Sequence, residues 1–256
     1  MSDKKILDYT SLDSFLGGKV ALHQPIKGYR ANIDSVLLAS AVDAEKGHTV
    51  LELGCGVGTV SLCLMARVNG VNVVGVELQS YYAKLANYNF RKNGAQGNIL
   101  ECCIKQIPSE YKQIDYDRVI LNPPYYRISK KETIKKTPVE IAKKEIELCL
   151  DDWLDTAITR CAQKGKVVII HKTERLSQIL KLFDRRLGGV IIRPIASKKG
   201  EAAKRILLCG EKGSAAPLQI LPTFHIHRGI TRDDLSTNYT VKAEGILRHA
   251  KGLDWT

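Results

Sequence analysis

The sequence predicts an α/β fold in which a seven-stranded, mostly parallel Rossmann-like sheet with an antiparallel edge strand carries helices on both faces. Short apolar runs rich in β-branched residues alternate along the chain with stretches of helical periodicity, which is the pattern of parallel strands joined by crossover helices. A glycine cluster directly after one of these runs is typical of a ligand-binding turn in such a sheet. With 256 residues, 44% of them hydrophobic, the chain can bury a sizeable core, and we expect one main domain.

Seven apolar runs are predicted to be strands. They lie at residues 49–53, 71–77, 98–102, 116–121, 166–171, 190–195 and 205–209. Only residues 196–204 separate the last two runs, and they show no helical pattern. We therefore expect these two strands to pair as an antiparallel hairpin at one edge of the sheet.

Five stretches between these runs are predicted to be helices, at residues 35–42, 59–68, 80–93, 151–161 and 174–186. Each can bury an apolar stripe against the sheet, and in the last of them the stripe consists of Leu176, Ile179, Leu180 and Phe183. The charged stretch 127–144, which lacks glycine and contains Pro138, is predicted to be a surface loop leading into a helix.

The charge balance favours a polyanionic partner. The chain has 39 Lys and Arg against 27 Asp and Glu, a net charge of +12, which attracts nucleic acid through its phosphates. The alternative is that the positive net charge only keeps the protein soluble and has no specific partner.

The seven cysteines are odd in number and form no CxxC pair, so neither a disulfide framework nor a zinc ribbon is expected. His225 and His227 alternate on a predicted strand without a third ligand nearby, so we expect no metal site. No apolar stretch approaches the roughly 20 residues of a membrane-spanning helix. We expect a soluble, unexported protein with reduced thiols in the cytoplasm.

The glycine cluster comprises Gly54, Gly56 and Gly58, between the strand 49–53 and the helix 59–68. Glycines there let a ligand approach the backbone at a helix start. A dinucleotide-binding turn would have its third glycine where Thr59 stands. The next strand ends about twenty residues later in Glu77, whose carboxylate can accept hydrogen bonds from both hydroxyls of a ribose.

The glycine cluster and Glu77, together with Glu52, resemble the first two motifs of the class I S-adenosylmethionine-dependent methyltransferases. The resemblance implies S-adenosylmethionine as the cofactor, with Glu52 near its methionine end. A nicotinamide-binding domain or a plain αβ turn is the alternative. Methyltransferases often have an Asp after the third strand that meets the cofactor's adenine, and Cys103 stands at that position here. Backbone groups near Cys103 and Ile104, or Glu101 if the register differs by two, are the candidates to replace it.

The strand 116–121 stops at Asn122-Pro123-Pro124-Tyr125, because two prolines cannot continue sheet pairing. This motif and the glycine turn both follow parallel strands, so they can meet at the carboxyl edge of the sheet. An exocyclic amine on a base is planar and a poor nucleophile. The Asn122 amide oxygen and the Pro123 carbonyl could accept its two N–H groups and favour the pyramidal form, while Tyr125, with Tyr126 beside it, offers a ring for an unstacked base.

The Asn-Pro-Pro-Tyr motif is shared by methyltransferases that act on adenine, on guanine N2 of ribosomal RNA and on glutamine of release factors. Residues 24–39 resemble the N-terminal signature of the bacterial tRNA1(Val) adenine-37 N6-methyltransferase family, and the similarity extends through residues 138–145 and 168–176, including His171, Glu174 and Arg175. The resemblance implies methylation of adenine N6 in tRNA, at position 37 beside the anticodon. An rRNA guanine or protein glutamine methyltransferase remains an alternative, as does a nucleic-acid-binding protein that has lost catalysis.

The N-terminal segment 1–45 is expected to cover the cofactor crevice of the methyltransferase domain 46–256. Asp34 and Ser35 begin a helix whose amide end faces this crevice, below a loop with Gln24 and Tyr29. Asp34 either contacts the cofactor or only caps the helix. The predicted RNA contacts are Lys27, Arg30, Arg127, Lys130, Lys131, Lys135 and Lys136. A second candidate patch comprises Lys198, Lys199, Lys204 and Arg205.

Overall fold

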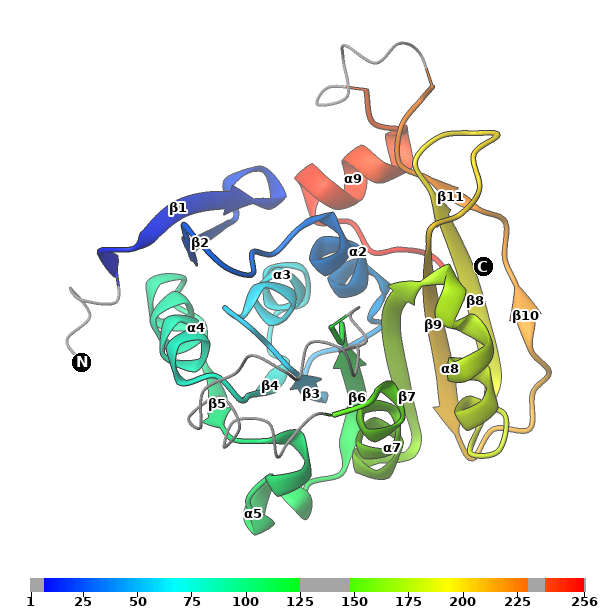
Figure 1. Ribbon diagram of the computed structural model, residues 1–256, viewed down its shortest axis with the longest axis horizontal. Helices are drawn as coiled ribbons and strands as arrows, with labels where there is room; N and C mark the ends of the chain where they lie inside the picture. Colours follow the sequence, from blue (N-terminus) through cyan, green and yellow to red (C-terminus); the bar gives the residue numbers. More distant parts are fainter. Residues whose placement is uncertain (1–6, 125–147, 230–237, 256) are drawn as a thin grey trace, which may run out of the picture.

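A single twisted β-sheet forms the centre of the protein, and helices cover both of its faces (Figure 1). The computed structural model describes residues 7–124, 148–229 and 238–255. The segment 127–144, predicted to be a surface loop, lies outside the described residues. Among the described residues, no helix is both long and apolar enough to cross a membrane.

The nine strands of the sheet run in the order β10-β8-β9-β7-β6-β3-β4-β5, with β11 also paired to β8. Their bounds are β3 (Thr49–Leu53), β4 (Asn72–Glu77), β5 (Gly97–Glu101), β6 (Tyr116–Leu121), β7 (Cys161–Lys172), β8 (Leu187–Ala196), β9 (Arg205–Lys212), β10 (Gln219–Ile220) and β11 (Phe224–His225). All seven predicted strands are present, and the mostly parallel Rossmann-like sheet is confirmed.

The antiparallel strand is placed differently from the prediction. β9 pairs antiparallel with β8, as expected, but it also pairs antiparallel with β7 and therefore lies inside the sheet. The physical reason is its apolar character on both faces, since Leu207 and Cys209 face one core and Ile206 and Leu208 the other. The edge beyond β8 is formed by the two-residue strands β10 and β11; the sequence analysis placed His225, which is in β11, on a strand but indicated neither β10 nor the pairing of the two strands with β8.

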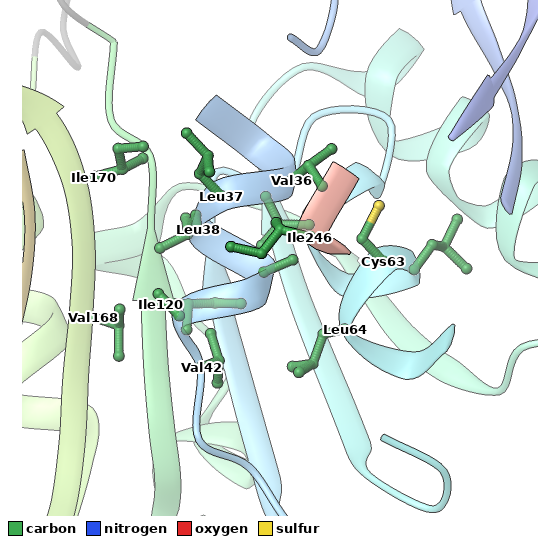
Figure 2. Close-up of a cluster of buried hydrophobic side chains, with 14 of the residues drawn as sticks. Val36, Leu37, Leu38, Val42, Cys63, Leu64, Ile120, Val168, Ile170 and Ile246 are labelled. Atoms are coloured by element: carbon green, nitrogen blue, oxygen red, sulfur yellow. The ribbon is translucent and has the colours of Figure 1, made fainter. Parts of the chain in front are cut away.

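Alternate residues of the central strands supply two separate cores. One contains Val50, Ile120 and Val168 and is covered by α2 (Ile33–Ala41), α3 (Thr59–Arg67) and α9 (Val241–His249). Figure 2 shows Leu37, Leu38 and Ile246 among the buried side chains of this core, together with Ile120 and Val168 of the sheet. The other core contains Leu51 and Val119 and is covered by α7 (Leu150–Arg160) and α8 (Leu176–Phe183).

The other helices within the described residues are α4 (Ser80–Lys92), α5 (Ser109–Lys112) and the 3-10 turns η1 (Leu16–Gly18), η2 (Ile104–Gln106) and η5 (Thr173–Arg175). All five predicted helices are confirmed, with shifted ends. Because η5 occupies the start of the stretch 174–186, α8 begins only at Leu176.

An N-terminal hairpin of β1 (Thr10–Phe15) and β2 (Val20–Pro25) forms a second, two-stranded sheet that the sequence pattern did not indicate. Two asparagines of α4 hold it in place. The Asn93 side chain accepts from Ala21 N at 2.9 Å and donates to Ala21 O at 2.7 Å. The Asn89 side chain binds His23 N at 2.9 Å and His23 O at 3.0 Å. The two amides thus act like a neighbouring strand, and they fix β2 against α4.

Candidate active site at the carboxyl edge of the sheet

The ends of three neighbouring strands bring the predicted site together. In the register of the sheet, Leu53 at the end of β3 pairs with Val76 of β4 and with Leu121 at the end of β6. Gly54 and Asn122, the next residues of β3 and β6, therefore leave the sheet side by side at its carboxyl edge. The sequence-based expectation that the glycine turn and the Asn-Pro-Pro motif converge agrees with this geometry.

The glycine turn needs glycine for both conformation and space. Gly54, Gly56 and Gly58 have positive φ angles of 68°, 54° and 86°. A Cβ on Gly54 would lie 2.7 Å from the Trp153 ring, and one on Gly58 would lie 2.8 Å from the Phe90 ring. The sequence did not point to Trp153, which comes from α7, one hundred residues away, and packs its ring on the first glycine of the turn.

Glu77 ends β4 with its carboxylate turned toward the glycine turn. One carboxylate oxygen accepts from Gly56 N at 3.0 Å and the other from Gln79 N at 2.8 Å. Burial raises the pKa of this carboxyl, while the backbone hydrogen bonds from Gln79 and Gly56 lower it. A carboxylate is thus fixed at the position where the sequence predicts contact with ribose hydroxyls.

Glu52 lies beneath the glycine turn and is only 3% exposed. Its carboxylate accepts from Ser61 N at 3.1 Å and forms a short hydrogen bond with the Ser61 hydroxyl. Burial raises the pKa of Glu52 to about 8, with the charge of Glu77 adding to the rise and the Ser61 bonds opposing it. Glu52 is therefore mostly protonated at neutral pH and is directed toward the first turns of α3.

The segment between β2 and α2 lies over the glycine turn. Tyr29 N donates to the Tyr82 hydroxyl of α4 at 2.9 Å. The Tyr29 ring lies close to Gly56, where an added Cβ would be 3.7 Å from Cε1. Gln24 is buried and accepts from Ala31 N at 2.7 Å, which closes the loop. The loop is thus held in a defined conformation beside the glycine turn.

Two basic residues predicted to meet RNA occur in this loop. Arg30 donates to Pro25 O at 2.7 Å and forms an ion pair with Asp13, so its guanidinium helps to hold the hairpin and the loop together. Lys27 is exposed. Neither contact with RNA is tested by the structure, and both stay predictions.

Asn32, rather than Asp34, caps α2. The Asn32 side chain accepts from Asp34 N at 2.8 Å, and the helix begins at Ile33. Asp34 instead pairs with Arg205 of β9, with Oδ2 and Nε 3.0 Å apart. This pair joins the start of α2 to the central sheet, and it engages one member of the second predicted basic patch.

The acceptor loop is described up to Pro124. After β6, Asn122 is half-buried, Pro123 is buried and Pro124 is exposed. The predicted site residues Tyr125, Arg127, Lys130, Lys131, Lys135 and Lys136, and the neighbouring Tyr126, lie outside the described residues.

His171 borders this loop, because β7 pairs with β6 through Ile169 and Leu121 and His171 follows two residues later. It is 2% exposed, and its Nδ1 accepts from Lys172 N at 2.8 Å. Burial, and then the charges of Arg175, Arg205 and Lys172, lower the pKa of His171 to about 4. The imidazole is therefore neutral, with its proton on Nε2. The sequence resemblance had included His171 without assigning it a role.

The loop after β5 adjoins the same edge. Cys102 N donates to Glu77 O at 3.0 Å. Cys103 is buried and precedes η2, whereas Glu101 pairs with Glu77 in the sheet and is exposed. Which of these groups meets an adenine stays a prediction.

No group of three or more His, Cys, Asp and Glu side chains that could hold a metal ion occurs within the described residues. All seven cysteines are free thiols.

Comparison with known proteins gives one family match. Residues 29–148 match the family model of the methyltransferase small domain. This range includes the glycine turn, Glu77 and the acceptor motif.

Two curated relatives are tRNA1(Val) (adenine(37)-N6)-methyltransferases. The protein of Actinobacillus pleuropneumoniae is 26% identical over 183 residues, which are 70% of this chain and 75% of the relative. That of Shewanella baltica is 26% identical over 226 residues, covering 86% of this chain and 91% of the relative.

Solved structures share the fold. A predicted O-methyltransferase from Agrobacterium tumefaciens matches with a TM-score of 0.68 and 22% identity over 86% of this chain and 98% of its own. A T. thermophilus 16S rRNA N2 methyltransferase in complex with AdoMet and guanosine matches with a TM-score of 0.56 and 18% identity, over 79% of this chain and 50% of its own. The class I methyltransferase fold is thus confirmed.

Proposed function

We propose that the protein transfers a methyl group from S-adenosylmethionine to N6 of an adenine in tRNA, since residues 29–148 match the family model of the methyltransferase small domain. The target we propose is position 37, beside the anticodon. With tRNA as its partner, the protein would act in the cytoplasm.

The observation that carries this proposal is the register of β3 and β6. Because Leu53 and Leu121 pair, the glycine turn and the Asn122-Pro123-Pro124 loop emerge from adjacent strands. A cofactor held by the glycine turn therefore lies next to an acceptor held by the Asn122-Pro123-Pro124 loop. Bringing two reactants together in this way removes much of the entropic cost of a bimolecular reaction.

The residues of the glycine turn fit S-adenosylmethionine. Gly54, Gly56 and Gly58 keep the backbone open, and the fixed Glu77 carboxylate at the neighbouring strand end suits a pair of ribose hydroxyls. We assign Glu52 to the methionine end and Cys103 to the adenine end. The proposed cofactor contact of Asp34 stays a prediction; its ion pair with Arg205 holds the start of α2, in the segment 1–45 that we propose covers the cofactor crevice.

When bound, S-adenosylmethionine would supply a methyl group activated by its sulfonium; the S–CH3 bond would break as the N6–CH3 bond forms, S-adenosylhomocysteine would remain as the product, and the extra N6 proton would leave after transfer. The protein's task is then to present a nitrogen lone pair. Asn122 and the Pro123 carbonyl accept the two N–H groups of the adenine amine and favour its pyramidal form, and Pro124 and Tyr125 complete the wall against which the base lies. The buried, neutral His171 beside this loop adds no positive charge that would oppose attack on a sulfonium.

Adenine in tRNA is favoured over the other acceptors by two observations. The relatives that match most of this chain are named for adenine-37 N6 in tRNA1(Val). The net charge of +12 suits an RNA substrate better than a protein glutamine. Guanine N2 in ribosomal RNA is the second candidate, because the fold is shared with an enzyme of that kind.

The test uses Asn122→Ala with Asn87→Ala as its matched control, since Asn87 is a half-exposed asparagine of α4. Tritium transfer from S-adenosylmethionine to unmodified tRNA should fall by about a hundredfold or more in Asn122→Ala and stay unchanged in the control. Calorimetry should give both variants the wild-type affinity for S-adenosylmethionine. Robust transfer by Asn122→Ala would refute the assigned role of the acceptor loop, and a folded wild-type protein that binds no S-adenosylmethionine would favour the non-enzyme alternative.

A further inference from the structure

The outer face of α4 alternates aromatic and basic side chains. Tyr81, Lys84, Tyr88 and Arg91 are spaced three, four and three residues apart, so they lie on one side of the helix, and Lys92 adjoins them. We call these five residues the α4 stripe. The lysines and the arginine are exposed, and the two tyrosines are half-buried.

The opposite side of α4 fixes how the stripe is presented. Leu85, Ala86, Asn89 and Phe90 are buried against the sheet and β2. Asn89 also donates to Val57 O of the glycine turn at 3.0 Å. The helix therefore cannot rotate without breaking buried contacts, and these contacts fix the backbone that carries the α4 stripe.

The centre of the stripe is an aromatic platform. The rings of Tyr88 and of His23 from β2 meet edge to face, with centroids 5.2 Å apart and planes at 86°. Arg91 Cζ lies 5.9 Å from the centroid of the Tyr88 ring. The half-buried Tyr88 ring and the exposed Arg91 guanidinium are both flat groups on which a nucleic-acid base can stack.

The electrostatics of the surface also fit a polyanion. α4 contains three cationic side chains and no acidic one. Burial and the positive charge of Lys92 lower the pKa of His23, so this imidazole is neutral at pH 7. A stripe of exposed cations with interleaved aromatic rings matches the phosphates and the bases of one RNA strand.

The stripe begins near the carboxyl edge of the sheet. α4 begins at Ser80, three residues after Glu77, so Tyr81 is near the carboxyl edge of the sheet and Arg91 is about 15 Å farther along the helix. In Figure 1, α4 lies beside the β1–β2 hairpin and β5, while α8 lies toward the other end of the sheet. About 15 Å is the length of roughly four stacked nucleotides.

We infer that the α4 stripe, together with His23, is a docking surface for the nucleotides that flank the target base of the RNA substrate. This inference rests on the proposed function, because it assigns the RNA partner to a particular face of the protein. It adds a contact surface on the side of the crevice formed by α4, apart from the basic residues named from the sequence.

The test compares two variants that each remove one lysine and one arginine. Lys84→Ala/Arg91→Ala alters the stripe, and Lys181→Ala/Arg185→Ala, at exposed positions of α8 and just beyond it, is the control. Fluorescence anisotropy with labelled unmodified tRNA should give about tenfold weaker binding for Lys84→Ala/Arg91→Ala. The slope of the logarithm of its binding constant against the logarithm of the salt concentration should be shallower than that of wild type by about one to two. The control should stay within about twofold of wild type.

Stacking is tested separately. Tyr88→Leu should weaken tRNA binding about tenfold, and Tyr88→Phe should retain it. Both should keep the wild-type affinity for S-adenosylmethionine, which shows that they fold.

Wild-type tRNA affinity and salt dependence in the stripe variant, or an equal loss in the control, would overturn the inference. A change of oligomeric state with unchanged tRNA affinity would assign the face to a second copy of this chain and overturn it as well. Because anisotropy measures binding alone, a wild-type protein that binds tRNA through the stripe but transfers no methyl group would refute the proposed function and leave the docking surface standing.

Discussion

Replacing Glu52 with glutamine tests the electrostatics beneath the glycine turn. Glutamine keeps an oxygen that can accept from Ser61 N and the Ser61 hydroxyl, but it cannot ionise. The pKa of Glu52 rises from an ordinary value of 4.5 to about 8 in the folded protein, mainly through burial. Between these two values the folded protein holds a proton that the unfolded chain has lost. Unfolding then releases a proton, so the free energy of unfolding falls as the pH rises.

The size of the effect follows from the shift. One pKa unit corresponds to about 1.4 kcal/mol, so this single carboxyl lowers the free energy of unfolding by roughly 3 kcal/mol between pH 4.5 and pH 7. Because Glu52 is only 3% exposed, solvent screening reduces this figure little. Glu52→Gln should therefore gain stability over wild type as the pH rises, and the gain should level off above about pH 8.

Urea unfolding of both proteins at about pH 5, 6, 7 and 8 measures the difference, in which the titration of all other groups cancels. Glu101→Gln, at the exposed end of β5, is the matched control and should follow wild type at every pH. Curves for wild type and Glu52→Gln that run parallel across this range would show that Glu52 is ionised in the folded protein, and would refute the reasoning.

Three further predictions follow from the contacts around the site. Gly54→Ala should lower the free energy of unfolding by about 2–3 kcal/mol, since its φ is 68° and its Cβ would lie 2.7 Å from Trp153. Adding Trp153→Leu to the same chain should restore part of this loss. If the losses from the two substitutions simply add, the contact with Trp153 is not the cause. Asn89→Ala should lower the free energy of unfolding, measured in urea, by about 2–4 kcal/mol because it leaves buried backbone groups without partners. An equal loss in the half-exposed Asn87→Ala would argue against the hydrogen bonds to β2 as the cause. The NMR signals of the His171 ring should titrate near pH 4, and a midpoint near its ordinary 6.5 would show that the ring is not buried as described.

The sheet could be predicted from the sequence because its strands are locally distinct. Each apolar run is separated by a helical period or a glycine turn, so the alternation was visible without knowledge of the contacts. The position of β9 between β7 and β8 was not visible, since a short connection predicts an antiparallel hairpin but not which of its strands faces the rest of the sheet. The apolar residues on both sides of residues 205–209 were the available signal.

The candidate site, too, was only partly predictable from the sequence. Gly54, Glu77 and Asn122 were identified because each ends a strand or follows it directly, and parallel strand ends share one edge. Trp153 on the glycine turn could not be found in this way, because its contact joins elements far apart in the chain.

The fixing of β2 by Asn89 and Asn93 depends on two side chains that, in sequence, are ordinary polar residues of a helix. At the start of α2, Asn32 and Asp34 are both good capping residues, and only the structure distinguishes them, because Asp34 is engaged by Arg205.

Mass spectrometry of the methylated nucleoside tests the central claim most directly. Unmodified tRNA with an adenine beside the anticodon is incubated with the protein and with S-adenosylmethionine carrying a deuterated methyl group, and is then digested to nucleosides. The account predicts deuterated N6-methyladenosine, formed by wild type and lost in Asn122→Ala. Label in N2-methylguanosine, or no label in tRNA from a protein that binds S-adenosylmethionine, would contradict it.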